Sequence, residues 1–165
     1  MAADASVSNL GWDLNVANDD LLVARLDLQA QQRRLLLAAA DLGIVRRSPA
    51  ALVCSAAADV SGDVRSSRDG VVALRNDTAR VKGSLKVVGV DLLRLHEQLQ
   101  APRLSAATTN QLSDAQARAG RSMHRYDATA RELLADAQRL LERTARVGGS
   151  ATRRCAQATK LPGSR

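Results

Sequence analysis

The sequence of 165 residues is nearly without aromatic side chains: it has no Phe, one Trp (Trp12) and one Tyr (Tyr126). Compact globular cores usually depend on such side chains, each of which buries about 150–250 Å². Ala, Leu, Val, Arg and Asp dominate instead. Because Ala, Leu and Val suffice for narrow contacts between helices, we expect packed helices rather than an ordinary globular core.

Groups that carry chemistry are also scarce. The two cysteines, Cys54 and Cys155, are too few and too far apart in sequence for a disulfide framework, which favours a reducing compartment. The two histidines and two cysteines lack the short paired spacing of a zinc site, and no glycine-rich phosphate loop occurs. We therefore expect no enzyme activity, no catalytic residues, no metal site and no cofactor.

Long hydrophobic runs are missing as well. The sequence has no run of about 18 apolar residues, the length that a helix needs to span a bilayer. The first residues also lack the basic and apolar regions of a secretion signal. Together with the cysteine pattern, this predicts an intracellular protein, cytoplasmic rather than nuclear, with no transmembrane segment.

What the sequence does have is a heptad repeat, typical of helices that pack along a seam. In the first segment one heptad position holds Leu14, Leu21, Leu28, Leu35 and Leu42, and the other holds Leu10, Ala17, Ala24, Gln31, Ala38 and Val45. Beside this seam lies a second apolar strip, formed by Leu22, Leu26, Leu36, Leu37 and Ile44. We expect this helix to contact more than one other helix.

The second segment keeps the heptad register throughout. Its seam is Val53, Ala57, Val60, Val64, Ser67, Val71, Leu74, Thr78, Val81, Leu85, Val88, Leu92, Leu95 and Leu99. Interior glycines and the many valines weaken a helix, so a β-hairpin over residues 71–90 is an alternative. The period of 3.5 residues favours the helix.

A third seam follows Pro102, which is expected to end the second helix. It comprises Leu112, Gln116, Ala119, Met123, Tyr126, Ala130, Leu133, Ala137, Leu140, Thr144 and Val147. Gly148 and Gly149 then predict the end of this helix. The remaining residues carry basic but no acidic side chains, so we expect residues 148–165 to form a disordered basic tail.

These patterns predict an all-α fold: an elongated antiparallel coiled coil, or three-long-helix bundle. The helices are expected at about 10–46, 50–101 and 105–147, within a coiled-coil domain of residues 10–147 that follows a flexible N-terminus of residues 1–9. Short connections, such as Ser48 and Pro49, make successive helices antiparallel neighbours. The middle helix is expected to be longest and to extend past its partners, which leaves part of its seam for another chain.

We therefore expect a non-enzymatic scaffold or adaptor subunit of a tethering, cytoskeletal or kinetochore-type assembly. Its partners would be other helical proteins, in a hetero-oligomer rather than a homo-oligomer. The expected partner-binding seam is Leu14, Leu21, Leu28, Leu35, Val71, Leu74, Val81, Leu85, Val88, Leu92 and Leu95, with Trp12 as a further candidate anchor.

Charge supplies the alternative function. The net charge is +7, and it changes along the chain from −2 over residues 1–46 to +4 over residues 148–165. Arg153, Arg154 and Lys160 are candidates for electrostatic recruitment, and with the Arg-rich third helix they suit nucleic acid or chromatin. A membrane surface would be contacted only through this tail. Genomic base composition is an equally good explanation of the arginine content.

Overall fold

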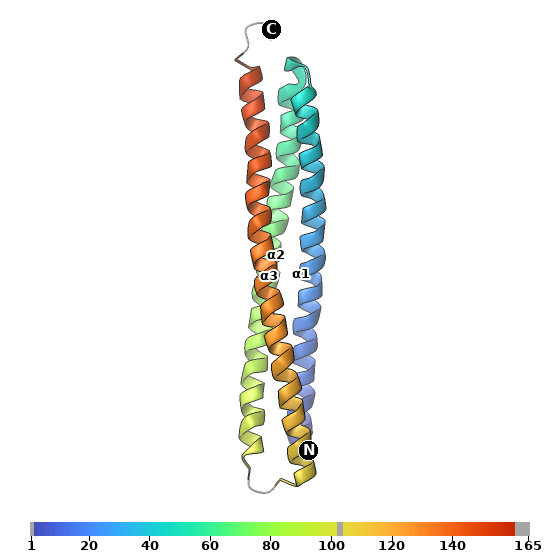
Figure 1. Cartoon of the computed structure of the whole chain (residues 1–165), viewed down its shortest axis with the longest axis vertical. Coiled ribbons are helices and arrows are strands. Elements are labelled where there is room, and N and C mark those ends of the chain that lie inside the picture. The colour runs from blue at the N-terminus through green and yellow to red at the C-terminus, as the bar shows by residue number, and fades with distance from the viewer. Residues whose placement is uncertain (1, 102–103, 161–165) are drawn as a thin grey trace. The chain divides into compact units, whose positions relative to one another are not determined.

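The computed structural model of the chain describes residues 2–101 and 104–160, with side chains from residue 5 onward. It consists of three helices: α1 (Ala2–Arg47), α2 (Ala50–Leu99) and α3 (Ala106–Ala158) (Figure 1). The described residues contain no β-strand. The predicted all-α, three-helix fold is confirmed.

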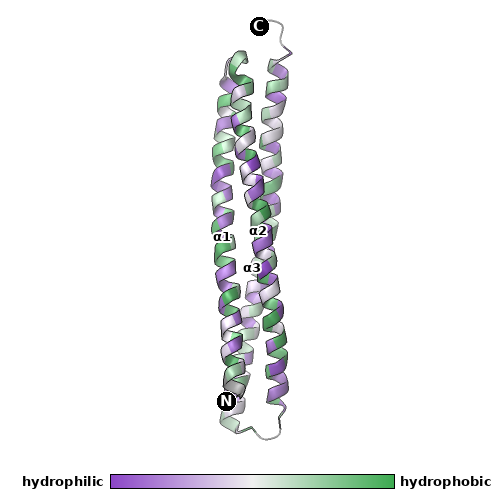
Figure 2. Ribbon diagram, turned by 180° about the vertical axis from the view of Figure 1, so that it is seen from behind, coloured by the Kyte–Doolittle hydropathy of each residue, from purple (hydrophilic) through white to green (hydrophobic). Residues whose placement is uncertain are grey.

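Residues 71–90, for which a β-hairpin was the alternative prediction, are helical. α2 continues without interruption through residues 71–90, and Val71, Leu74 and Val81 along it are fully buried. Strands would place successive side chains on opposite faces, whereas the buried residues recur at the three- and four-residue spacing of a helix. Figure 2 shows the corresponding alternation of hydrophobic and hydrophilic residues along each ribbon.

Short, polar connections separate the helices. The Ser48 hydroxyl donates to the carbonyl oxygen of Ile44 at 3.0 Å, at the end of α1. α3 begins with a true cap: the Thr108 amide donates to the Ser105 hydroxyl oxygen at 3.2 Å. α2 ends at Leu99, before Pro102, which lies outside the described residues.

The chain divides into two compact units, and each contains a stretch of all three helices. Unit 1 comprises Met1–Ala24 and Asn76–Leu134. Its core joins the start of α1, the end of α2 and the start of α3, and the buried residues are Leu10, Val88, Leu95, Leu112, Ala115 and Ala119. The Gln98 amide donates to the Ser6 hydroxyl at 3.0 Å, which shows that α1 and α2 are antiparallel here.

Unit 2 comprises Arg25–Arg75 and Ala135–Arg165. Its core includes Leu42, Val45, Val53, Ala57, Val60, Ala151 and Ala158. Cys54 pairs with Cys155, and Val64 contacts Gly148, so α3 runs antiparallel to α2. α1 is linked to α2 by the tight connection at Ser48 and Pro49, and it runs parallel to α3.

Both expected flexible ends prove to be largely helical. α1 begins at Ala2 rather than Leu10, because Val7 packs against the unit 1 core and extends the seam. α3 continues through Gly148 and Gly149 to Ala158 rather than ending at Val147. The prediction of a disordered tail is therefore wrong for residues 148–158, and residues 161–165 lie outside the described part of the chain.

The interpretation of the cysteines also needs correction. Cys54 and Cys155 form a disulfide with a Cα–Cα distance of 4.6 Å, although 101 residues separate them in sequence. The antiparallel packing of α2 and α3 brings the start of one beside the end of the other. Disulfides persist in oxidising environments, so the cysteines no longer support a reducing compartment.

Candidate partner-binding face

The seam residues that were predicted to bind a partner pack against other helices of the same chain. Those of the set that are buried are Leu21, Leu28, Leu35, Val71, Leu74, Val81, Leu85, Val88 and Leu95, while Leu14 and Leu92 are partly buried and pack against the unit 1 core. A partner helix could reach this set only by displacing one of the chain's own helices. Its role in partner binding stays a prediction.

The expected overhang of the middle helix is absent. α3 is the longest helix with 53 residues, against 50 in α2 and 46 in α1. The difference arises because α1 and α3 both extend beyond their predicted ends. Residues 71–85 of α2, which were expected to be left for another chain, keep their seam side chains buried within this one.

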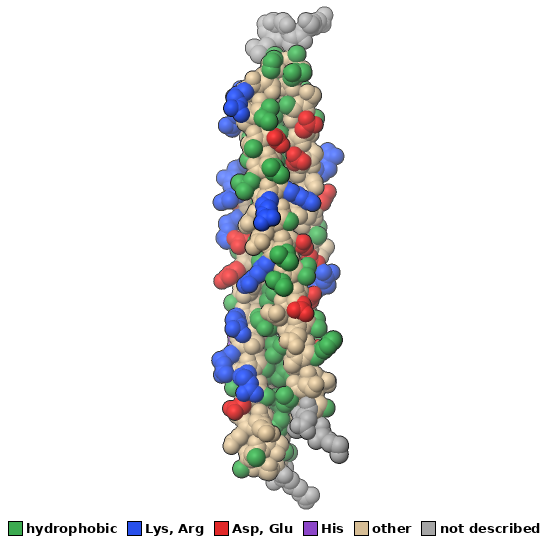
Figure 3. Space-filling view, turned by 90° about the vertical axis from the view of Figure 1, so that its right-hand side faces the viewer, with side chains coloured by type: hydrophobic (Ala, Val, Ile, Leu, Met, Phe, Trp, Pro, Cys, Tyr) green, Lys and Arg blue, Asp and Glu red, His purple; other side chains and the backbone are tan. Residues whose placement is uncertain are grey.

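The second apolar strip of α1 remains exposed. In the heptad with Leu14 at position a and Leu10 at position d, the outward positions b, c and f hold most of the exposed large hydrophobic residues of the helix. In unit 1 these are Trp12, Val16, Leu22 and Val23; in unit 2 they are Leu26, Leu36, Leu37 and Ile44. We call these residues the outer face of α1. Hydrophobic side chains reach the surface between charged ones in Figure 3.

The exposure of this face is large enough to require an explanation. Trp12 and Leu36 are each 71% exposed and Leu37 is 64% exposed. Single exposed hydrophobic residues are normal, but contiguous apolar patches on a surface mark interaction sites. Position c is apolar in five successive heptads, at Val16, Val23, Ala30, Leu37 and Ile44, although no seam contact within the chain demands it.

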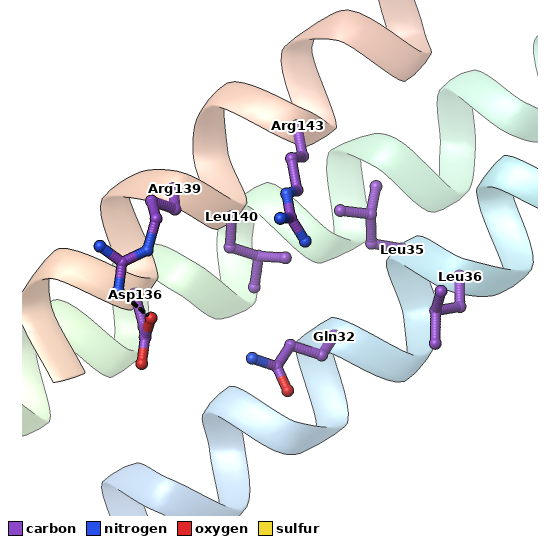
Figure 4. Close-up of a pocket in the computed structure, with 7 residues that line it drawn as sticks. All are labelled: Gln32, Leu35, Leu36, Asp136, Arg139, Leu140 and Arg143. Atoms are coloured by element: carbon purple, nitrogen blue, oxygen red, sulfur yellow. Dashed lines mark hydrogen bonds and ion pairs between the residues drawn. The ribbon is translucent and has the colours of Figure 1, made fainter. Parts of the chain in front are cut away.

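Within unit 2 the outer face borders a groove between α1 and α3 (Figure 4). The groove has a volume of about 350 Å³. Leu35 and Leu36 from α1 and Leu140 from α3 supply its apolar lining. Arg139 and Arg143 lie along its α3 side; Arg139 is ion-paired with Asp136, whereas Arg143 has no charged partner among the described residues.

The two parts of α1 carry opposite charge. Residues 5–24, in unit 1, include three aspartates and no Lys or Arg, a net charge of −3. Residues 25–47, in unit 2, include five arginines and two aspartates, a net charge of +3. Asp19 and Arg33, which occupy outward position f, are exposed and make no ion pair among the described residues. Most of the other charged residues of α1 lie at positions e and g; the charged residues at the outward positions are Asp19 in unit 1 and Arg33 and Arg47 in unit 2.

The candidates for electrostatic recruitment lie in or next to α3 rather than in a tail. Arg153 and Arg154 are exposed on its last turns, and Lys160 follows the helix. With Arg46 of α1, Arg153 and Arg154 line a shallow hollow in unit 2 that has no acidic lining residue. A similar hollow in unit 1 is lined by Arg118, Arg121 and Arg125.

Asp13 in unit 1 is a titratable group with a shifted pKa. The pKa of Asp13 is raised by burial, and further by its hydrogen bond to Asp91 and by the negative charge of Asp91. Asp91 itself also binds Arg94 at 3.1 Å. In the described part of the chain no three His, Cys, Asp or Glu residues gather in a way that could hold a metal ion.

Sequence reasoning missed two features of the site. Val16 and Val23 belong to the outer face, and their seven-residue spacing with Leu37 and Ile44 is the signal that could have found them. The disulfide was missed because the seam was taken to end at Val147. Ala151 and Ala158 continue its heptad spacing, and Cys155, which packs against the same core, lies beside the seam as Cys54 lies beside Val53.

Comparison with protein-family models, with curated proteins and with solved structures finds no match for this chain. Among the described residues, no helix combines the length and the hydrophobicity needed to cross a bilayer. The functional conclusion therefore depends on the chain's own surface.

Proposed function

We propose that the protein is a non-enzymatic, coiled-coil scaffold or adaptor that binds a partner helix through the outer face of α1. The observation that carries this proposal is the exposure of Leu26, Leu36, Leu37 and Ile44 in unit 2, and of Trp12 and its neighbours in unit 1, after the seams are filled. Apolar residues at heptad spacing are what a helix presents to another helix.

This proposal moves the partner-binding surface from the seams to the outer face. The seams remain the internal contacts that hold α1, α2 and α3 together. A partner helix lying on α1 would bury leucine and valine side chains without disturbing those contacts. The groove beside Leu36 would let such a helix settle between α1 and α3, where Arg143 offers a charged hydrogen-bond donor.

The test is affinity purification of the tagged full chain from its own cells, with quantification of co-purified proteins. Leu36→Asp combined with Leu37→Asp places two charges on the outer face and should remove the stoichiometric partner. Leu93→Asp, a matched change at an exposed leucine of α2, should retain it. Circular dichroism establishes that all variants keep their helical content. Retention of the partner by the double variant would refute the proposed surface.

A second candidate function is binding to the phosphate backbone of nucleic acid. The two hollows lined by arginine, one around Arg153 and Arg154 and one around Arg121, support it because neither has an acidic lining residue. Binding of this kind weakens steeply as salt rises. Arg153→Ala combined with Arg154→Ala should weaken capture of a duplex DNA probe at low salt, and salt-insensitive or absent capture by the wild-type chain would exclude this function.

A further inference from the structure

The outward positions of α1 carry charged residues of opposite sign beside the exposed hydrophobic residues, with Asp19 in unit 1 and Arg33 in unit 2. The acidic half-site, in unit 1, comprises Trp12, Val16, Asp19 and Leu22. The basic half-site, in unit 2, comprises Arg33, Leu36, Leu37 and Ala40. All eight side chains are exposed, and Asp19 and Arg33 are without an ionic partner in the described part of the chain.

We propose that the partner helix on this face is α1 of a second copy of the chain, bound antiparallel, so that the acidic half-site of one copy lies on the basic half-site of the other. This inference rests on the proposed function, because it names the helix that the outer face binds. An antiparallel pair makes the same contact twice, as a two-fold symmetric interface requires.

The heptad register defines which residues would face each other. If Leu26, at position f, lies on the two-fold axis opposite Leu26 of the second copy, one heptad in either direction brings Asp19 opposite Arg33. Two heptads bring Trp12, the largest side chain of the face, opposite Ala40, one of the smallest. Val16 then faces Leu36 and Leu22 faces Ala30, whereas Leu37 faces Asn15 and Val23 faces Gln29.

This arrangement agrees in charge at Asp19 and Arg33 and in size at Trp12 and Ala40. A parallel pair would place Asp19 against Asp19 and Arg33 against Arg33, and like charges opposite one another cost free energy. It would also place Trp12 against Trp12 and Ala40 against Ala40. The antiparallel pair replaces both repulsions with attractions and combines a large with a small side chain, which is how helix surfaces pack closely.

The test is sedimentation velocity of the purified full chain over a range of concentrations. The wild-type chain should show a monomer–dimer equilibrium. Asp19→Arg alone and Arg33→Asp alone should each weaken the dimer on the order of tenfold or more, since each creates two like-charge contacts. Arg65→Asp, a charge reversal at an exposed residue of α2, is the matched control and should leave the dimer unchanged.

The decisive sample is an equimolar mixture of the two weakened variants. In a heterodimer of Asp19→Arg with Arg33→Asp, both facing pairs again have opposite charge, so the mixture should dimerise as strongly as the wild-type chain. The double variant, with both substitutions in one copy, should do the same. Failure of both to regain the dimer would overturn the antiparallel pairing.

Cross-linking checks the direction of the helices independently. A mixture of Trp12→Cys and Ala40→Cys copies should form an intermolecular disulfide under mild oxidation, and Trp12→Cys alone should not. A wild-type chain that stays monomeric would overturn this inference. If such a chain still captured another protein through Leu36 and Leu37, the proposed function would stand, with a different helical protein as the occupant.

Discussion

Polar side chains lie inside unit 2 where leucine or valine would be expected. Gln31 is buried on the α1 seam with its side-chain oxygen Oε1 unpaired, and the buried hydroxyl of Ser67 has no hydrogen-bond partner. The Gln31 side chain lies directly against Gly70, where a Cβ atom would come within 2.2 Å of it. Gly70 therefore makes room for Gln31, and we expect both residues to lower helix stability.

Replacing Gln31 with a residue of similar length but no polar group should stabilise the protein. An unsatisfied buried polar group costs about 1–3 kcal/mol, so Gln31→Met should raise the free energy of unfolding by about 1–2 kcal/mol. Thermal unfolding followed by circular dichroism would show this as a higher Tm. Gln32→Met, at the exposed neighbour, is the control and should change stability by less than about 0.5 kcal/mol. A lower Tm for Gln31→Met would contradict the conclusion that the Gln31 side chain destabilises the folded chain.

The contact between Asp13 and Asp91 in unit 1 makes stability depend on pH. Because burial and Asp91 raise the pKa of Asp13 in the folded state, the folded chain holds a proton more tightly than the unfolded chain does. Stability should therefore decrease as pH rises from the ordinary aspartate range through this raised pKa. Asp13→Asn should stabilise the chain at neutral pH, and the gain should shrink on acidification. A gain that stays constant down to low pH would show that Asp13 titrates normally.

At the scale of whole elements, the predicted seams were the reliable part of the sequence. Every predicted seam residue from Val53 to Leu99 is buried or partly buried in the structure, and so is every one from Leu112 to Val147. Helix ends were less predictable. Gly148 and Gly149 have the composition of a stop, but tertiary packing of Ala151 and Ala158 outweighs their low helix propensity.

The seams alone could not predict which apolar strip of α1 stays exposed. The sequence shows two apolar strips on α1, and no local signal in it tells which strip packs against α2 and α3. Leu35 and Leu36 are adjacent in sequence, yet the first is buried and the second is 71% exposed. Only the arrangement of α2 and α3 around α1 distinguishes the internal strip from the outer face.

The seams and the outer face should respond differently to truncation. Leu74→Ala removes a fully buried side chain and should lower the free energy of unfolding by about 2–5 kcal/mol. Leu36→Ala should change it by less than about 0.5 kcal/mol, since this side chain is exposed. Urea unfolding of the two variants in dilute solution measures both values. Equal losses would indicate that the outer face is packed inside the isolated chain.

The disulfide ties the last turns of α3 to the first turns of α2. Closing a loop of about 100 residues contributes up to about 4–5 kcal/mol by restricting the unfolded chain. Cys54→Ser combined with Cys155→Ser should therefore lower the Tm, and hydrogen exchange should speed up in residues 148–158. The oxidised wild-type chain should carry no free thiol. Free thiols in protein isolated without reductant, or an unchanged Tm in the variant, would refute the pairing.

On the scale of the whole molecule, the chain buries its seams internally and leaves the apolar residues of the outer face of α1 exposed. Some of its charged side chains form surface pairs, such as Arg131 with Asp127 and Arg94 with Asp91. The proposed binding surface is the outer face of α1, with Asp19 beside it in unit 1 and Arg33 beside it in unit 2.

The central claim, that binding uses the outer face of α1 rather than the seams, is tested most directly by the fluorescence of Trp12. This is the only tryptophan of the chain, and it is 71% exposed. In dilute solution acrylamide should quench it readily, and quenching should fall when the complex forms, whether with a second copy or with another helical protein. Trp12 that stays equally open to acrylamide in the assembled complex would contradict the claim.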